Sequence, residues 1–165
     1  MGVVALALVA TGCGDDDDAK PGPATSTRFP PTVPVNNDPL AEGEGACGLL
    51  NRGEVEATVS LPVNPGTGVR TKTNESCTWK LRSGANQFVA LFASESGVPQ
   101  YENAEKQLAQ VEQQSGVGDR AFVAGDTAYA LKGGRLVIVQ VLTSQPVPAR
   151  KQAALKLITG AISRG

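Results

Sequence analysis

Residues 120–143 read RAFVAGDTAYALKGGRLVIVQVLT and decide the fold that the rest of the chain must complete. Three short apolar runs with partial alternation are separated by Gly125-Asp126 and by Gly133-Gly134. Short glycine-containing turns between such runs are typical of neighbouring antiparallel strands. This stretch therefore predicts a three-stranded antiparallel meander.

A second group of strands is expected upstream of the meander. Residues 76–82 alternate and carry the single tryptophan, Trp79, while residues 87–94 (QFVALFAS) have a well-marked strand pattern. The four residues between them, SGAN, suit a turn. We predict a β-hairpin here, preceded by a weakly signalled exposed strand within residues 67–73.

Three helices are predicted around these strands. Asn51 followed three residues later by Glu54 resembles a capping box and predicts a short helix to about Val59. Residues 99–114, followed by Gly116, and residues 149–164 have helical apolar spacing. The apolar stripes consist of Tyr101, Ala104, Leu108 and Val111 in the second helix and of Ala154, Leu155, Ile158, Ala161 and Ile162 in the third.

Clusters of strands between isolated helices indicate the α+β class. We predict a single α+β globular domain over residues 46–165, with an antiparallel sheet of five to six strands and the helices packed on one face. About 120 residues are enough to enclose a hydrophobic core.

Composition excludes several function classes. The 165-residue chain has 15 basic and 16 acidic residues and a net charge of -1, which argues against a nucleic-acid partner or a polybasic membrane patch. The chain has no histidine, so catalysis by Ser-His-Asp or Cys-His and the common histidine-containing zinc sites are excluded. We predict no cofactor and no metal site.

Residues 3–13, VVALALVATGC, have an uncharged apolar run and small residues directly before Cys13. The stretch resembles a bacterial lipoprotein signal peptide with its lipobox over residues 1–13, although Ala10 stands where Leu is usual. The resemblance implies that the bond before Cys13 is cut and that Cys13 is acylated and palmitate-bearing. We therefore expect a protein anchored in the lipid bilayer at the extracytoplasmic face of the bacterial cell membrane.

Alternatives for residues 3–13 are a buried strand or helix with a core cysteine. A membrane-spanning helix needs about 20 apolar residues, more than this run provides. No basic residue precedes Lys20, and the missing basic segment predicts a translation start further upstream. Residues 14–45 are rich in Pro, Gly and Asp, so we predict a disordered tether between anchor and domain.

Cys47 and Cys77 remain once Cys13 is assigned to lipid. In an exported protein two such cysteines are expected to form a disulfide. A zinc or redox role would call for a CxxC spacing or a histidine, and the chain has neither. Two free buried thiols are the remaining alternative.

Several short motifs occur in a characteristic order along the domain. Together they resemble the actinobacterial lipoproteins grouped as domain of unknown function 3558, over about residues 40–164. The resemblance implies an envelope lipoprotein with a disulfide between the positions of Cys47 and Cys77, and it implies no activity, because none is assigned to that family. The motifs are ACGLL at residues 46–50, EV at 54–55, CTW at 77–79, GVGDRAF at 116–122 and the late Gly133-Gly134 turn before the last helix.

Three function classes follow from these observations. The first is a non-catalytic module that binds an envelope protein or another envelope component through an exposed apolar patch. The second is a carrier of a small apolar ligand, in a pocket lined by residues such as Leu91, Phe122 and Leu136. The third is a histidine-free envelope hydrolase with two converging acids or a Ser-Lys pair in a cleft. Its candidate acids are Glu95, Glu102, Asp119 and Asp126.

Overall fold

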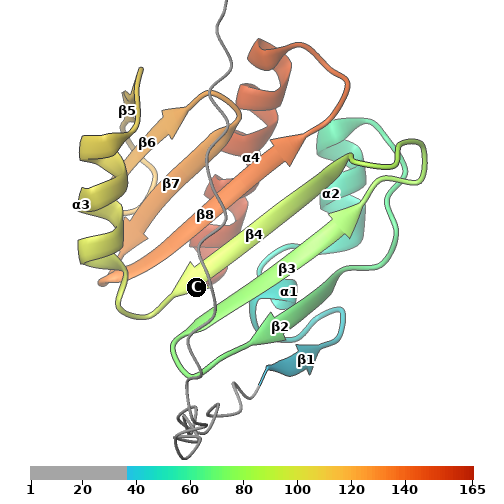
Figure 1. The fold of residues 1–165 in the computed structure, drawn as a ribbon, viewed down its shortest axis with the longest axis horizontal. Helices are drawn as coiled ribbons and strands as arrows, with labels where there is room; N and C mark the ends of the chain where they lie inside the picture. The colour runs from blue at the N-terminus through green and yellow to red at the C-terminus, as the bar shows by residue number, and fades with distance from the viewer. Residues whose placement is uncertain (1–36) are drawn as a thin grey trace, which may run out of the picture. The chain divides into compact units, whose positions relative to one another are not determined.

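The computed structural model describes residues 37–165, which belong to one compact unit. Eight strands form one antiparallel sheet in the order β1-β2-β3-β4-β8-β7-β6-β5 (Figure 1). The strands are β1 (Asp38–Leu40), β2 (Thr67–Arg70), β3 (Asn74–Lys80), β4 (Phe88–Ser94), β5 (Glu112–Gln114), β6 (Arg120–Ala124), β7 (Thr127–Lys132) and β8 (Arg135–Leu142). The helices are α1 (Gly45–Gly48), α2 (Arg52–Val59), α3 (Gly97–Gln107) and α4 (Val147–Arg164).

The predicted strand pairings in the centre of the sheet are confirmed. β3 and β4 form the expected hairpin, and β6, β7 and β8 form the expected meander. The meander turns contain Gly125, Gly133 and Gly134, whose φ angles are 61°, 57° and 85°. Glycine adopts these left-handed conformations without the steric cost that a side chain brings.

The predicted number of five to six strands is wrong, because the sheet has eight. Both edge strands, β1 and β5, are only three residues long, too short for alternation to mark them. β1 pairs with β2 and lies within residues 14–45, the stretch expected to be a tether, so the sheet begins upstream of Ala46.

Helix α2 forms at the predicted place. The Asn51 side chain accepts a hydrogen bond of 2.9 Å from the Glu54 N–H, and the Glu54 carboxylate accepts one of 3.0 Å from the Asn51 N–H. This reciprocal capping box satisfies two backbone donors that the first helical turn leaves without partners.

Helix α3 ends seven residues earlier than the predicted end at residue 114. Leu108 has extended backbone angles, Gln110 has a φ of 56°, and residues 112–114 join the sheet as β5. The interpretation of Gly116 as the helix stop is therefore wrong. Leu108 and Val111 fit a helical spacing, but pairing with β6 takes precedence over that local pattern.

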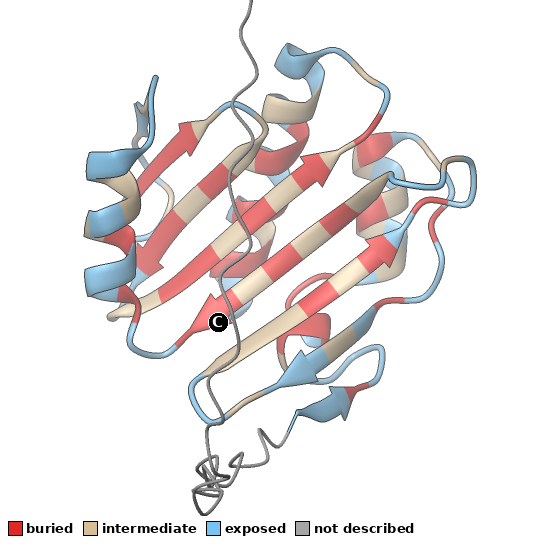
Figure 2. Ribbon diagram, in the orientation of Figure 1, coloured by how far each residue is buried: buried red, intermediate tan, exposed pale blue. Residues whose placement is uncertain are grey.

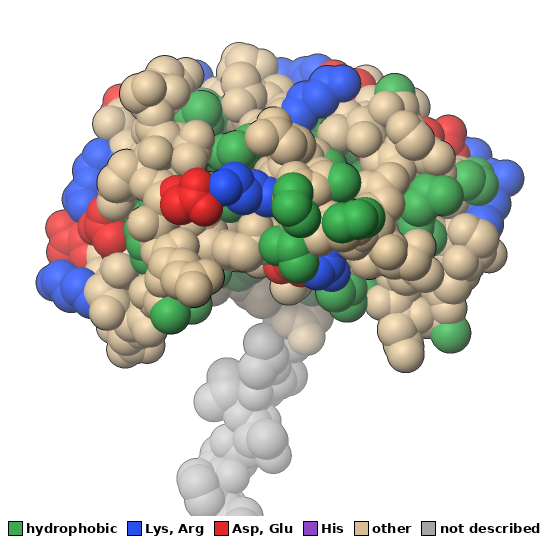
Figure 3. Space-filling model, turned by 90° about the horizontal axis from the view of Figure 1, so that it is seen from above, with side chains coloured by type: hydrophobic (Ala, Val, Ile, Leu, Met, Phe, Trp, Pro, Cys, Tyr) green, Lys and Arg blue, Asp and Glu red, His purple; other side chains and the backbone are tan. Residues whose placement is uncertain are grey.

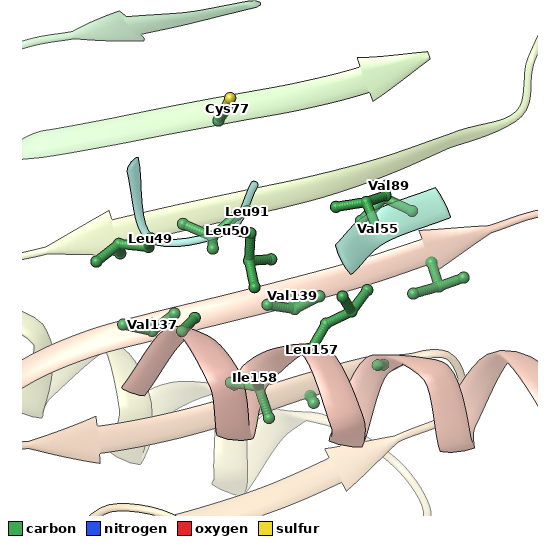
Figure 4. Packing of buried hydrophobic residues seen from close by; sticks show 14 of the residues in the cluster. Leu49, Leu50, Val55, Cys77, Val89, Leu91, Val137, Val139, Leu157 and Ile158 are labelled. Atoms are coloured by element: carbon green, nitrogen blue, oxygen red, sulfur yellow. The ribbon is translucent and has the colours of Figure 1, made fainter. Parts of the chain in front are cut away.

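The side chains of each strand alternate between the two faces of the sheet. We call the face that carries Val89, Leu91, Val137 and Val139 the rear face. Helices α1, α2 and α4 cover it, and their buried side chains join those of the strands in the main core (Figures 2 and 4). The largest fully buried residue, Trp79, lies in this core.

The opposite face is the front face, and α3 packs on it. Tyr101 of α3 lies edge-on to Phe122 of β6, with ring centroids 5.0 Å apart, in a second cluster with Leu131 and Leu136. The prediction that all helices pack on one face is therefore wrong for α3. Both faces of the meander strands carry apolar residues, so the sequence pattern does not assign the helix to a face.

Candidate binding surface on the open face of the sheet

Helix α3 packs on the front face over β7 and β8. Tyr129 and Ile138 are partly buried and pack against its cluster, so they border the part of the face whose remaining side chains lie outside that cluster. We call this part the open face. Seen from above, the front side of the domain is recessed between two projecting ends (Figure 3). The partly exposed residues of the open face are Ser76 and Thr78 of β3, Phe88, Ala90 and Phe92 of β4, Thr127 and Tyr129 of β7, and Ile138, Gln140 and Leu142 of β8.

The strand register arranges three of these residues in one apolar row that crosses the strands. Phe92 is opposite Ile138, and Ile138 is opposite Tyr129. Directly opposed residues have Cβ atoms about 4.5–5.5 Å apart, so neighbouring side chains are in contact. Tyr129 in turn stacks on Phe122, with ring centroids 4.5 Å apart. We call Phe92, Ile138 and Tyr129 the first apolar row.

A row of small and uncharged polar side chains runs beside the first apolar row. Thr67 is opposite Thr78, Thr78 is opposite Ala90, Ala90 is opposite Gln140, and Gln140 is opposite Thr127. We call these five residues the central strip. The strip combines hydroxyl and amide groups, which both donate and accept hydrogen bonds, with the small Ala90 side chain at its middle.

A second apolar row borders the central strip on its other side. Phe88 of β4 is opposite Leu142 of β8, and Lys80 is opposite Phe88 on the outer side. Phe88, Ala90 and Phe92 are successive front-face residues of one strand, so a methyl group stands between two phenyl rings. The central strip therefore lies between two rows of large apolar side chains.

A hollow of about 370 Å³ lies at one end of the central strip. Its lining includes Thr67, Val69, Thr78 and Lys80, which all project from β2 and β3 on the front face. Val69 is 42% exposed. The surface is thus shallowly hollowed and largely open to solvent at the end where the strip approaches the edge of the sheet.

The open face has little charge. Lys80 is the single charged side chain among the residues named in the central strip, the two apolar rows and the hollow. Burial, and then the nearby charge of Asp126, raise the pKa of Tyr129, so its phenol is neutral at ordinary pH. Such a surface matches an uncharged partner better than an ionic one.

Charges gather instead on the part of the front face that α3 covers. Arg120 lies 2.7 Å from Glu105 and 3.6 Å from Glu102, and its guanidinium is 4.8 Å from the centre of the Tyr101 ring. These exposed ion pairs link α3 to β6 and balance one another's charge.

The sequence pointed to three cysteines as site residues. Cys47 of α1 and Cys77 of β3 are joined by a disulfide, with their Cα atoms 5.0 Å apart, on the rear side of the sheet. Both side chains are buried. Cys13 and the predicted lipobox lie outside the described residues.

The four candidate acids make separate contacts. Glu95 pairs with Arg135 at 3.0 Å and Asp126 with Arg150 at 3.2 Å, while Glu102 faces Arg120. Asp119 accepts a hydrogen bond of 2.8 Å from the Gly133 N–H across the meander. Each of the four acids therefore contacts a different partner, and these contacts do not bring two of the acids together.

The residues suggested for a ligand pocket do not share one. Leu91 belongs to the core on the rear face, whereas Phe122 and Leu136 belong to the cluster under α3 on the front face. A separate hollow of about 280 Å³ lies between α2 and α4. It is lined by Leu50, Glu54, Ala57, Thr58, Lys156, Leu157 and Gly160.

The residues of the open face were missed by the sequence analysis. Residues 87–94 are apolar at nearly every position, so alternation does not reveal which side of β4 stays uncovered. The repeat of Phe88, Ala90 and Phe92 is the signal that marks the open side once the helices are placed.

Comparison with known proteins gives no match to a family model, to a curated protein or to a solved structure. Over residues 37–165, none of the helices has the length and apolar character needed to cross a membrane.

Proposed function

We propose that this chain is an exported envelope lipoprotein, anchored through lipid on Cys13, that acts as a non-catalytic binding module. Its binding surface is the open face. The proposal rests on one observation, the presence of apolar and aromatic side chains on the front face, of which Phe88, Phe92 and Leu142 lie outside both clusters that the helices cover. Contiguous apolar patches on a protein surface are typical of interaction sites.

Two further features support export. Disulfides persist mainly in oxidising compartments, and Cys47 and Cys77 are joined. The apolar run and small residues before Cys13 resemble a lipoprotein signal, and the motifs around residues 46–50 and 116–122 resemble the lipoproteins grouped as domain of unknown function 3558.

The anchor is tested by intact mass and membrane fractionation of the protein from its host, beside a Cys13→Ala variant. We expect an acylated wild-type protein in the membrane fraction and a variant that carries no lipid. A wild-type protein without lipid would refute the anchor.

The binding surface is tested with the full chain carrying Cys13→Ala, mixed with fragments of the host's cell envelope and sedimented. We expect the protein to sediment with the fragments, and Phe92→Asp to release it. Val98→Asp is the matched control, because Val98 is 41% exposed but lies on α3. Equal sedimentation of all three proteins would refute the role of the open face.

A carrier of a small apolar ligand is the second candidate, favoured by the hollow between α2 and α4. Its lining includes Leu50, Ala57 and Leu157, and its volume of about 280 Å³ is close to the lower end of ordinary ligand pockets. Lipid extraction and mass spectrometry of the purified protein, compared with Ala57→Trp, tests it. A bound lipid lost in that variant would favour the carrier.

A further inference from the structure

We infer that the central strip and its two apolar rows bind an uncharged glycan chain that crosses the strands of the sheet. This inference rests on the proposed binding role of the open face and names the class of ligand. Three observations carry it: the spacing of the rows, the chemistry of their side chains and the lack of charge.

The distances between the side chains of the two apolar rows and along the central strip leave room for one extended glycan chain. Residues two apart on a strand are about 6.7 Å apart, so Phe88 and Phe92 are separated by about 13 Å along β4. The central strip crosses β2, β3, β4, β8 and β7, and strands about 4.8 Å apart give it a length of about 19 Å. A shallow, open hollow at Thr67 and Thr78 lies at one end of the strip.

The side chains match the two kinds of surface on a sugar ring. The C–H groups of a pyranose or furanose face pack on an aromatic face, which Phe88 and Phe92 supply in partly exposed form. Its hydroxyl groups need partners that both donate and accept, as the Thr78 hydroxyl and the Gln140 amide do. Phe88 and Phe92 flank Ala90 along β4, and Thr78 and Gln140 flank it across the strands, so both kinds of contact are available around Ala90.

The charge pattern argues against ionic ligands. Lys80 stands outside the second apolar row, and the central strip itself is uncharged. A phosphate, an acidic polymer or an anionic lipid surface would find no cluster of basic side chains among the residues of the open face. An uncharged polymer does not need basic side chains to bind, so their absence from the residues of the open face does not weaken its binding.

The polar strip also argues against an acyl chain and against a peptide strand. An acyl chain laid between the apolar rows would bury the Gln140 amide without a hydrogen-bond partner, which costs free energy. A peptide that adds to a sheet pairs with an edge, and both edges, β1 and β5, are three residues long. The main chains of β4 and β8 are already paired with each other and with their other neighbours.

The test is affinity electrophoresis of the full chain carrying Cys13→Ala in gels that contain a neutral glucan, mannan, galactan or arabinan. We expect at least one neutral polymer to retard the protein equally at low and high salt, because screening does not weaken uncharged contacts. Phe92→Ser and Phe88→Ser are expected to weaken binding about three- to tenfold each. Val147→Ser is the control, since Val147 is 48% exposed at the start of α4.

Gln140→Leu separates a glycan from an apolar ligand. The substitution keeps the bulk of the side chain and removes its hydrogen-bonding groups, so glycan binding should weaken, whereas binding of an acyl chain should strengthen. Thermal unfolding of each variant checks that the fold is intact, and a Gln140→Leu variant that binds the glycan as well as wild type would overturn the inference.

The remaining outcomes distinguish this inference from the proposed function. If none of the neutral polymers retards the protein while envelope fragments still bind it through Phe92, the glycan is refuted and the binding role stands. If sedimentation velocity shows that Phe92 mediates pairing of two copies instead, the glycan is likewise refuted. If neither polymers nor fragments bind, both proposals fail.

Discussion

The backbone of Gly97 packs directly against Leu136 and leaves no space for a methyl group between them. A Cβ atom at Gly97 would lie 2.2 Å from the Leu136 Cβ and 2.3 Å from the Leu136 nitrogen. The Gly97 N–H also donates a hydrogen bond of 3.1 Å to the carbonyl of Gly134. This contact fixes the start of α3 on the front face beside the meander.

Gly97→Ala is therefore expected to destabilise the domain by about 1–3 kcal/mol, because backbone atoms of β8 must shift to admit the methyl group. Gly160→Ala is the matched control. A Cβ there meets only Leu50, at 3.8 Å, and the position is inside α4, so alanine should stabilise by about 0.5–1 kcal/mol. Urea unfolding of both variants measures the difference, and equal effects would contradict the close packing.

Removal of the disulfide is expected to lower stability by about 3–4 kcal/mol in the chain-entropy model, since Cys47 and Cys77 close a loop with a sequence separation of 30. The double variant Cys47→Ala/Cys77→Ala should show this loss in urea unfolding. Reduction of the wild-type protein should give a similar loss, and reductant should leave the double variant unchanged. If the urea midpoint of the wild-type protein were the same with and without reductant, the prediction would be contradicted.

The stability of the domain should depend on the ionisation of Glu54. A hydrogen bond from the Arg164 side chain, followed by the one from the Asn51 N–H, holds the pKa of Glu54 below its ordinary value of 4.5. A lowered folded-state pKa gives stability that is present above the unfolded-state pKa and is lost as the pH falls through the folded-state pKa.

Urea midpoints of wild type and Glu54→Gln from about pH 7 to about pH 3 measure this dependence. We expect wild type to be the more stable at neutral pH and the gap to narrow below about pH 4.5. Glu42→Gln, at an exposed position, should follow wild type at every pH. A gap that is constant with pH would show that the ionised carboxylate contributes nothing.

Asp119→Ala should cost about 1 kcal/mol, because it removes the acceptor for the Gly133 N–H. Asp119→Asn should cost less, because the amide oxygen is still an acceptor at the same distance along the side chain. Hydrogen exchange at the Gly133 amide gives a local measure, and it should accelerate in the alanine variant. Unchanged exchange there would show that the hydrogen bond does not protect the turn.

The hairpin, the meander and α2 could be predicted because each has a local signal. Gly133 and Gly134 specify a turn, and Asn51 with Glu54 specifies a helix start, whatever the rest of the chain does. The hydrogen bond from the Gly133 N–H to Asp119 joins the turn between β7 and β8 to the residue just before β6. These contacts are made by residues close in sequence or by adjacent strands.

The edges of the sheet and the end of α3 depend on partners far along the chain. β1 contributes a single buried side chain, Leu40, and is held by pairing with β2, about thirty residues later. Residues 112–114 are polar and become a strand only because β6 offers an unpaired edge. Local patterns of three residues do not contain this information.

The candidate binding surface depends on register, which the sequence specifies only indirectly. Phe92 is placed beside Ile138, and Ala90 beside Gln140, by the pairing of β4 with β8. A shift of one residue would turn these side chains to the other face. The disulfide was predicted from residue counts and compartment, whereas the open face emerges only when the helices and the register are known.

The position of the disulfide also sets the mechanical behaviour of the domain. A pull on the chain upstream of Asn37 would act first on β1, which only three residues pair with β2, and then on α1. Unravelling would stop at Cys47, because its sulfur is bonded to Cys77 in β3, next to the centre of the sheet. Tension applied to the N-terminal side thus separates one edge strand, while β3, β4, β8 and β7 keep their register.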